Sequence, residues 1–491
     1  MRLEKHWTTI RGLGGGLLAG LSLNHGQVLF MWLGIALLWS VSRNVSVSFL
    51  WGLVAVLVSH SWLLSLHPLT WIGIPAPMSL PIAIGIWFFC GLFAGSLVCF
   101  WALISNYFLL VGSRDRDSWA KFAGVVVLSC LWGLAEVLLA HYPLFWIGVG
   151  GSVLPGDRAL AGLARWFGAG GLAAIQLLIG FWLWHTFVAF QRGLGWIKPL
   201  VLGLSFVVLA HVFGSSLLID EIGTNPIPVA FWQSDIPTRK KFSEEQQLRL
   251  PSSLQESLSK AKDLSASWLV APEGTLNTNQ ELLSPAPVPL LSGGFRWERG
   301  GQRSSLLVFE KGETTYSVAV DKHRLVPLGE RTPKLFRFGI RGLSAIGGLE
   351  PGDPSRLLLW SGPPAAIAIC YELSDGNALA NAVKNGAEWI LALANLDPYP
   401  ISLQKQFLAI SQLRSIENSR ELINVANTGP SGLILSSGQV DKAIPPFKEA
   451  TELVEIHLKK SVDGYPIWTE LPLVACLTIA LFIRFWMATI N

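Results

Sequence analysis

The chain has 491 residues, of which 51% are hydrophobic and only 14% are Asp, Glu, Lys or Arg. Soluble proteins average about 25% charged residues, so the composition excludes a chain that is soluble throughout. Residues 1–219 hold 16 of the 70 charged residues (37 + 33), residues 220–465 hold 52, and the last 26 residues hold two. We therefore expect a membrane region at 1–219, a soluble region at 220–465 and a membrane tail at 466–491.

Charge and cysteine content narrow the function of the soluble region. Residues 220–465 carry 27 acidic and 25 basic residues, which gives no sign of a nucleic-acid partner. Cys90, Cys99, Cys130 and Cys476 lie in apolar runs, where a thiol is usually a small hydrophobic group. Cys370 is the one cysteine in the soluble region, so a disulfide within that region is excluded.

Eight apolar segments are candidates for membrane-spanning helices, since a span needs about 20 mainly apolar residues. Seven precede the soluble region and one follows it: residues 8–24, 27–42, 46–66, 80–111, 119–141, 166–190, 197–217 and 468–488. The first segment has no A-x-A-like cleavage site, and we expect it to be a retained span.

The distribution of Lys and Arg predicts the orientation of these spans, because short cytoplasmic loops are rich in both. With a cytoplasmic N-terminus, the inner segments carry nine Lys or Arg residues and the outer loops carry only Arg158 and Arg165. Seven spans then place residues 220–465 outside the cytoplasm and the eighth returns the C-terminus inside. Glu136 lies within a span, where it either meets water or a neighbouring helix near the outer end, or has a substrate-facing or packing role.

The soluble region alternates β-rich runs with helical segments, which is typical of a layered α/β domain. Strands are predicted at 227–233, 267–271, 316–320, 365–369, 389–394, 422–426 and 431–436, and helices at 252–263, 374–385 and 403–420. Functional side chains of α/β sheets tend to lie at the carboxyl ends of strands, and three candidates follow such runs here.

Glu273, Lys322 and Cys370 each follow a β-rich run. A carboxylate that loses solvation at a strand end suits a general base, and a lysine there can stabilise an oxyanion. A thiol at a strand-to-helix junction meets the positive end of the helix, which favours the thiolate and covalent catalysis. Taken singly, each residue also fits an ordinary role: a turn carboxylate, a solvated surface lysine and a buried structural cysteine.

Together, the order Glu, Lys, Cys at spacings of 49 and 48 residues (322 − 273 and 370 − 322) resembles the nitrilase superfamily. Pro272-Glu273, the Lys-x-x-Leu-Val-Pro-x-Gly-Glu run from Lys322 to Glu330, and Cys370-Tyr371-Glu372 resemble apolipoprotein N-acyltransferases. The resemblance covers essentially the whole chain. It implies about eight spans and an extracytoplasmic nitrilase-like α-β-β-α sandwich between the last two spans.

The resemblance also implies a mechanism and a location. Cys370 would take an acyl chain from a membrane phospholipid as a thioester, with Glu273 as general base and Lys322 as oxyanion stabiliser. Glu330 would position both, and Tyr371 and Glu372 would flank the nucleophile. The acceptor would be the α-amino group of a lipoprotein's N-terminal S-diacylglyceryl cysteine, in a ping-pong reaction on the periplasmic side of a bacterial inner membrane. No metal or soluble cofactor is implied.

The chain departs from the family pattern at several positions. The usual Asn-Asp-Ala-Trp-Phe-like run reads Asn395-Leu396-Asp397-Pro398-Tyr399, and Phe242, Gln406 and Leu139 stand where Trp, His and Arg are common. These changes concern substrate preference and the partner of Glu136. Two other functions stay open: a nitrilase-type amidase or hydrolase on a membrane anchor, and a transporter or receptor with an inactive sensor domain.

Overall fold

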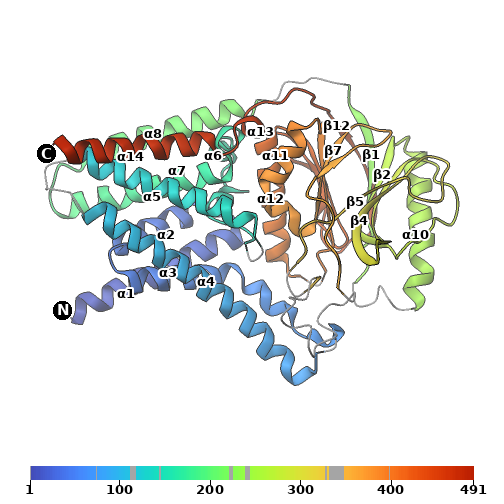
Figure 1. Ribbon diagram of the computed structural model, residues 1–491, viewed down its shortest axis with the longest axis horizontal. Coiled ribbons are helices and arrows are strands. Elements are labelled where there is room, and N and C mark those ends of the chain that lie inside the picture. The colour runs from blue at the N-terminus through green and yellow to red at the C-terminus, as the bar shows by residue number, and fades with distance from the viewer. Residues whose placement is uncertain are drawn as a thin grey trace. The chain divides into compact units, whose positions relative to one another are not determined.

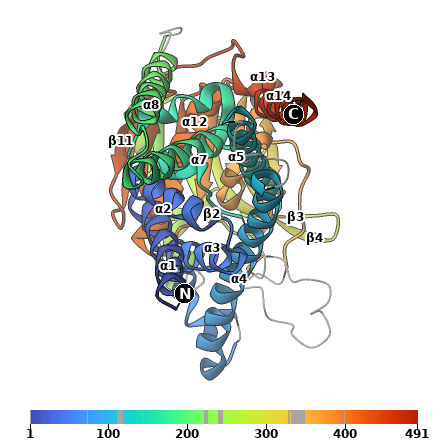
Figure 2. The same ribbon diagram turned by 90° about the vertical axis from the view of Figure 1, so that its left-hand side faces the viewer.

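The computed structural model describes residues 2–72, 74–110, 118–142, 145–219, 225–237, 244–326, 329–330, 348–397 and 399–490. The chain forms two compact units (Figures 1 and 2). The helical unit comprises Met1–Leu64, Pro81–Ile219 and Trp468–Asn491, and the α/β unit comprises Ser65–Leu80 and Asp220–Ile467.

Apart from the short α6, the helices of the helical unit overlap the predicted apolar segments. They are α1 (Arg2–His25), α2 (Val28–Val41), α3 (Val45–Ser59), α4 (Ala76–Leu110, in this unit from Pro81 on), α5 (Ser118–Ala140), α6 (Arg158–Ala161), α7 (Ala164–Gln191), α8 (Ile197–Leu217) and α14 (Leu471–Ile490). Within the described residues, four helices are long and apolar enough to cross a membrane: those at Ala76–Phe108, Trp119–Ala140, Ala164–Gln191 and Ile197–Leu217. Apolar α2, α3 and Leu471–Met487 are shorter, so a total of eight spans stays a prediction.

Tryptophan side chains form much of the core of the helical unit. Trp101 packs edge-on against Trp39 and Trp132, with ring centroids 5.1 and 5.5 Å apart. The indole N–H of Trp39 donates to the Leu177 carbonyl (2.9 Å), and that of Trp101 donates to the Leu128 carbonyl (3.1 Å). The indole rings of Trp39 and Trp101 therefore contribute both apolar packing and a hydrogen bond to another helix.

Glu136 acts within this core as an acceptor of hydrogen bonds. Its side chain is buried, with a relative exposure of 9%. Oε1 accepts from the indole N–H of Trp132 (2.9 Å) and the backbone N–H of Val149 (2.7 Å), and Oε2 accepts from the N–H of Gly150 (3.0 Å). The structure therefore favours the packing role. These donors bind the carboxylate although Leu139 replaces the arginine common in the family.

We expect Glu136→Leu to destabilise the helical unit, because it leaves three donors without an acceptor. Each buried unpaired donor costs on the order of 1–3 kcal/mol. The thermal unfolding midpoint in detergent should fall clearly. Glu136→Gln is the matched control, since its carbonyl oxygen still accepts. Equal midpoints for the Leu variant and the wild type would contradict this role.

In its described residues, the α/β unit contains two six-stranded sheets. The first has the order β12-β1-β2-β3-β4-β5 and the second β11-β10-β9-β8-β7-β6. The strands are β1 (Ile227–Gln233), β2 (Trp268–Leu276), β3 (Leu290–Glu298), β4 (Gly301–Phe309), β5 (Val318–Asp321), β6 (Leu357–Leu358), β7 (Ala365–Ile369), β8 (Trp389–Ala394), β9 (Leu422–Ala426), β10 (Ser431–Ile434), β11 (Val440–Ile444) and β12 (Ala450–Ile456). Each sheet has three parallel strands at its centre, β1-β2-β3 and β7-β8-β9, and antiparallel strands outside them.

The two sheets share one apolar core and carry helices on their other faces. Alternate residues of β1, Val229 and Phe231, pack with Leu391 and Ile423 of the second sheet. The intervening Ala230 faces α10 (Glu244–Asp263). The helices α11 (Gly376–Lys384) and α12 (Ile401–Asn418) contact the second sheet, so α10 and this helix pair lie on opposite sides of the sheets (Figure 1). A short helix, α13 (Tyr465–Trp468), follows β12.

The predicted strand bounds agree best with the structure for strands at the centre of a sheet. The predictions for 227–233, 365–369, 389–394 and 422–426 match β1, β7, β8 and β9 residue for residue, since strands buried on both faces read as continuous apolar runs. The β3–β4 hairpin and strands β6, β11 and β12 were missed. Polar or glycine residues interrupt the hairpin, as in Ser292-Gly293-Gly294, and this weakens the strand pattern.

Candidate functional site

Glu273 lies inside β2 rather than after it, which corrects the predicted end of that strand. The strand continues to Leu276, but its pairing with β3 is irregular between Ala271 and Leu276. Pro272 lacks an N–H and suits this interruption. A Cβ at Gly293 of β3 would lie 2.4 Å from Cα of Glu273, so only glycine permits this close approach. The irregular pairing and the close approach of β3 fix the backbone that carries Glu273.

Lys322 directly follows β5, and its side chain is buried between two glutamates. Its exposure is 1%. Nζ donates to Oε1 of Glu273 (2.9 Å) and to Oε1 of Glu330 (2.7 Å). The other oxygens accept backbone N–H groups: Glu273 Oε2 from Asn395 (3.0 Å) and Glu330 Oε2 from Val326 (2.8 Å). The structure therefore brings together three of the predicted residues.

The two carboxylates stabilise the charge of Lys322. Burial opposes the charge of Lys322, but the carboxylates of Glu273 and Glu330 outweigh it and raise the lysine pKa well above its ordinary value. Burial and the nearby Glu273 carboxylate raise the pKa of Glu330, although Lys322 acts in the opposite direction. The lysine is therefore a permanent cation at neutral pH, as an oxyanion stabiliser requires.

Cys370 directly follows β7 and opens a short 3₁₀ helix (Cys370–Ser374). Its backbone has φ +54°, the left-handed region that non-glycine residues rarely adopt, and such strain is frequent at functional sites. Burial raises the thiol pKa, and the Glu273 carboxylate raises it further, whereas Lys322 lowers it. The expected preference for a thiolate is therefore wrong for the resting site. The α-helix α11 starts only at Gly376, after the Asp375 cap, and not at the junction that Cys370 occupies.

Glu372 ties the segment of Cys370 to the segment of Lys322. Its Oε2 accepts the backbone N–H of Ile369 (2.9 Å), the residue before Cys370. Its Oε1 accepts the N–H groups of His323 (2.7 Å) and Arg324 (3.2 Å), which follow Lys322. The carboxylate thus holds the backbones of both segments together.

Tyr371 is held by a cation. The guanidinium of Arg324 lies 4.4 Å from the centre of the Tyr371 ring, and its Nη2 is 3.2 Å from the tyrosine hydroxyl. Its Nη1 donates to the hydroxyl of Ser374 (2.8 Å). The residue after Cys370 is therefore fixed to the loop that follows Lys322.

Asp321 anchors the end of β5 just before the lysine. Its Oδ1 accepts from Arg296 Nε (2.6 Å) and Ser305 (2.7 Å), and its Oδ2 accepts from Arg303 (2.8 Å). Burial opposes its ionisation, but Arg296, Ser305 and Arg303 hold the pKa of this carboxyl at about 2. Asp321 is therefore ionised and fixed at neutral pH.

Sequence reasoning missed two features of this site. The backbone N–H of Asn395 binds Glu273, a role that no side-chain motif reveals. Tyr399, noted only as a departure, lies near the same group of charged residues: burial, followed by the electrostatic effects of Cys370 and Glu330, raises the pKa of its hydroxyl. Its position five residues after β8, near the carboxyl end of a central strand, could have indicated that Tyr399 lies at the site. Gln406 is buried in α12, and Phe242 lies outside the described residues.

The arrangement combines a thiol, an acceptor for its proton and a buried cation. This set can support nucleophilic attack on a carbonyl carbon, with the proton passing to Glu273 and the oxyanion facing Lys322. Within the described residues, no group of three or more His, Cys, Asp or Glu side chains could hold a metal ion.

The raised thiol pKa predicts how Cys370 reacts with iodoacetamide. Only the thiolate reacts, so the alkylation rate should keep rising from pH 7 to pH 10, without a plateau near neutrality. Glu273→Gln removes a negative charge that raises the pKa and should shift the profile to lower pH, whereas Lys322→Met should shift it upward. Mass spectrometry of the Cys370 peptide separates this reaction from that of the other cysteines. A plateau by pH 7 would contradict the raised pKa of Cys370.

No family model matches the chain, but curated relatives match almost all of it. A protein named apolipoprotein N-acyltransferase from Prochlorococcus marinus (strain MIT 9313) is 56% identical over 493 residues, with 99% of each chain covered. The protein of that name from Parasynechococcus marenigrum is 48% identical, covering 93% of this chain and 96% of its own. The one from Synechocystis sp. is 27% identical, with 81% of each chain covered.

Solved structures of nitrilase-superfamily proteins also match, at low similarity. An amidase from Nesterenkonia sp. is 14% identical, with a TM-score of 0.36, and the match covers 52% of this chain and 98% of the amidase. Saccharomyces cerevisiae Nit3 is 13% identical with a TM-score of 0.36, and the match covers 48% of this chain and 92% of Nit3. These scores are too low to support an argument, so the assignment rests on the curated relatives. On that evidence, this chain belongs to the apolipoprotein N-acyltransferase family.

Proposed function

We propose that the chain transfers a fatty acyl group from a membrane phospholipid to the α-amino group of a lipoprotein's N-terminal S-diacylglyceryl cysteine, through a thioester on Cys370. One observation carries the proposal. The buried Lys322 ammonium binds Glu273 and Glu330, and their charges act on the Cys370 thiol. Membership of the N-acyltransferase family supports this assignment of a Cys-Glu-Lys triad.

The first half-reaction acylates the enzyme. Glu273 accepts the proton of the Cys370 thiol while Sγ attacks the ester carbonyl carbon of the phospholipid. The ammonium of Lys322 has three N–H donors, of which Glu273 and Glu330 accept two, so one can donate to the oxyanion. The C–O bond of the ester then breaks, Glu273 returns the proton to the leaving oxygen, and a lysophospholipid departs.

The second half-reaction transfers the acyl group to the amine. The neutral amine attacks the thioester carbonyl, the oxyanion again faces Lys322, and Glu273 accepts the proton that the nitrogen loses. The C–S bond breaks and the proton passes from Glu273 to the sulfur, which restores the thiol. The two substrates react in turn at one site, so the kinetics should be ping-pong.

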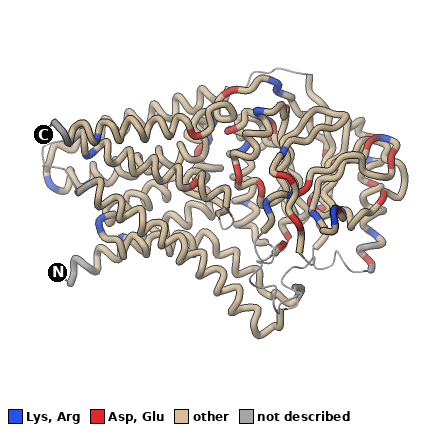
Figure 3. The backbone as a smooth tube through the Cα atoms, viewed as in Figure 1, with Lys and Arg blue, Asp and Glu red and all other residues tan. Residues whose placement is uncertain are grey.

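The proposed architecture keeps both lipid substrates at the membrane. We assign residues 1–219 to seven spans, 220–465 to a periplasmic nitrilase-like α-β-β-α sandwich and 466–491 to an eighth span of a bacterial inner membrane. Lys and Arg of the helical unit lie mainly at the end that holds both chain termini, which supports a cytoplasmic location for that end (Figure 3). A site beside the membrane avoids moving acyl chains into water, at about 0.8 kcal/mol per CH₂.

Mass spectrometry of the acyl-enzyme tests the chemistry. Wild-type protein incubated with phospholipid in detergent should gain one acyl mass on the Cys370 peptide, and a lipopeptide acceptor should remove it. Cys370→Ala should gain none. Lys322→Ala should slow acylation by about 10²–10³-fold, the usual effect of losing an oxyanion donor. An adduct that persists in Cys370→Ala would place the nucleophile elsewhere, and rapid release of free fatty acid without acceptor would indicate a hydrolase.

Reporter fusions test the topology. Alkaline phosphatase is active only outside the cytoplasm, so a fusion after residue 219 should give high activity in cells. A cytoplasmic reporter at the same position should be inactive and provides the control. The reverse pattern would overturn the periplasmic assignment of residues 220–465.

A further inference from the structure

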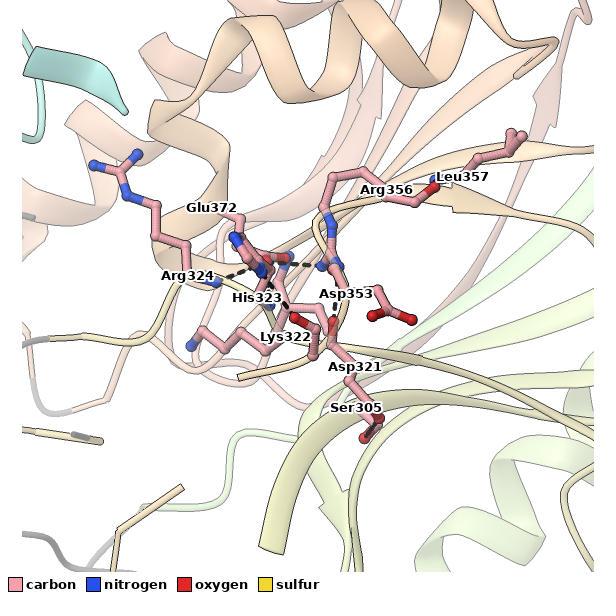
Figure 4. Close-up of polar contacts among 12 residues, drawn as sticks. Ser305, Asp321, Lys322, His323, Arg324, Asp353, Arg356, Leu357 and Glu372 are labelled. Carbon is pink, nitrogen blue, oxygen red and sulfur yellow. Dashed lines mark hydrogen bonds and ion pairs between the residues drawn. The ribbon is translucent and has the colours of Figure 1, made fainter. Parts of the chain in front are cut away.

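Arg356 is a buried arginine beside the site that has no part in the mechanism above. It directly precedes β6, and its exposure is 3%. Nη1 donates to Oε1 of Glu372 at 2.7 Å, and Nη2 donates to the carbonyl oxygens of Asp321 (2.9 Å) and Asp353. Figure 4 shows the guanidinium pointing toward Glu372 and toward the backbone at Asp321.

These contacts lie on both sides of Lys322. The carbonyl of Asp321 directly precedes the lysine, and the N–H groups of His323 and Arg324, which follow it, bind the same Glu372 oxygen as Arg356. The other oxygen of Glu372 binds the N–H of Ile369, next to Cys370. Arg356 is therefore bonded directly to the Lys322 segment, and through Glu372 to the Cys370 segment.

We infer that Arg356 is a positioning residue that fixes the ammonium of Lys322 relative to the sulfur of Cys370. The inference rests on the proposed function. The planar guanidinium donates in fixed directions from two nitrogens, so it can hold a carboxylate and two carbonyls at once. A lysine has one nitrogen and cannot reproduce this geometry.

The energetics favour positioning over stability as the role of this arginine. A buried ion pair adds little net stability, because desolvating both charges offsets their attraction. The Nε of Arg356 is also buried without a hydrogen-bond partner among the described residues, which is an added cost. Misplacement of a catalytic group by about 1 Å can reduce a rate by about 10²-fold.

The chain offers a matched control in Arg420. Its side chain is 1% exposed, and its guanidinium donates to the backbone carbonyls of Ala387 (3.1 Å) and Ser461 (2.9 Å). Both arginines are thus buried and bind backbone oxygens, but these bonds of Arg420 involve neither the Lys322 nor the Cys370 segment. Arg356→Lys and Arg420→Lys keep a positive charge but remove the planar guanidinium and its fixed donor directions.

The experiment measures acylation of the full-length protein by phospholipid in detergent, together with the thermal midpoint. We expect Arg356→Lys to lower the acylation rate constant by about 10²-fold, with KM for phospholipid within about twofold. The iodoacetamide profile of Cys370 should move to higher pH, because Lys322 no longer lies where it stabilises the thiolate. Arg420→Lys should change neither property. A folded Arg356→Lys variant that acylates at the wild-type rate would overturn the inference. So would a fall in the acylation rate of both variants that merely parallels the fall in their thermal midpoints.

Glu372→Gln provides a second test if Arg356→Lys does not fold. This change keeps the shape of the side chain but weakens its bond to the guanidinium, so it should shift the alkylation profile of Cys370. An unchanged profile would refute action through Glu372. Where the single variants fold, the acylation rate of the double variant should fall by less than the product of the two single fold-changes, because both residues act through one contact. Alkylation needs no lipid, so it still reports on Arg356 if the wild type forms no acyl-enzyme and the proposed function fails.

Discussion

The burial of the Lys322 ammonium is the constraint on which the site depends. A cation removed from water must be neutralised by nearby charges or lose its proton. Glu273 and Glu330 provide that neutralisation at 2.9 and 2.7 Å. The same carboxylates disfavour a further negative charge, so Cys370 rests as a thiol. In the proposed mechanism, attack of Cys370 on a carbonyl is therefore coupled to proton transfer, with the Glu273 carboxylate as the proposed proton acceptor.

Hydrogen bonds from backbone N–H groups to buried carboxylates hold the segments around the site together. Glu273, Glu330 and Glu372 each accept at least one, which links strand ends and loops that are distant in sequence. The helical unit follows the same rule, since Glu136 binds two N–H groups of one loop. A buried carboxylate that accepts backbone N–H groups has its charge satisfied. The same hydrogen bonds fix the backbone, mainly of segments that are neither helix nor strand.

The sequence by itself was sufficient to locate the helices and strands that are mainly apolar along their length. The long helices of the helical unit are mainly apolar, and the central strands β1, β7, β8 and β9 are largely buried, so the residue pattern alone is sufficient to locate them. The motifs around Glu273, Lys322 and Cys370 likewise identified the candidate triad, because local strings carry the family resemblance.

Only the tertiary structure decided which groups meet. β2 and β5 are separated by two strands of the sheet, yet Glu273 of β2 and Lys322, which follows β5, are in contact. The β3–β4 hairpin, the Asn395 N–H and Arg356 gain their roles from strand register and burial, which no local pattern encodes. The protonation state of Cys370 was also decided there. A helix end near in sequence favours a thiolate, but the desolvation and the two carboxylates that oppose it exist only once distant segments have packed around the sulfur.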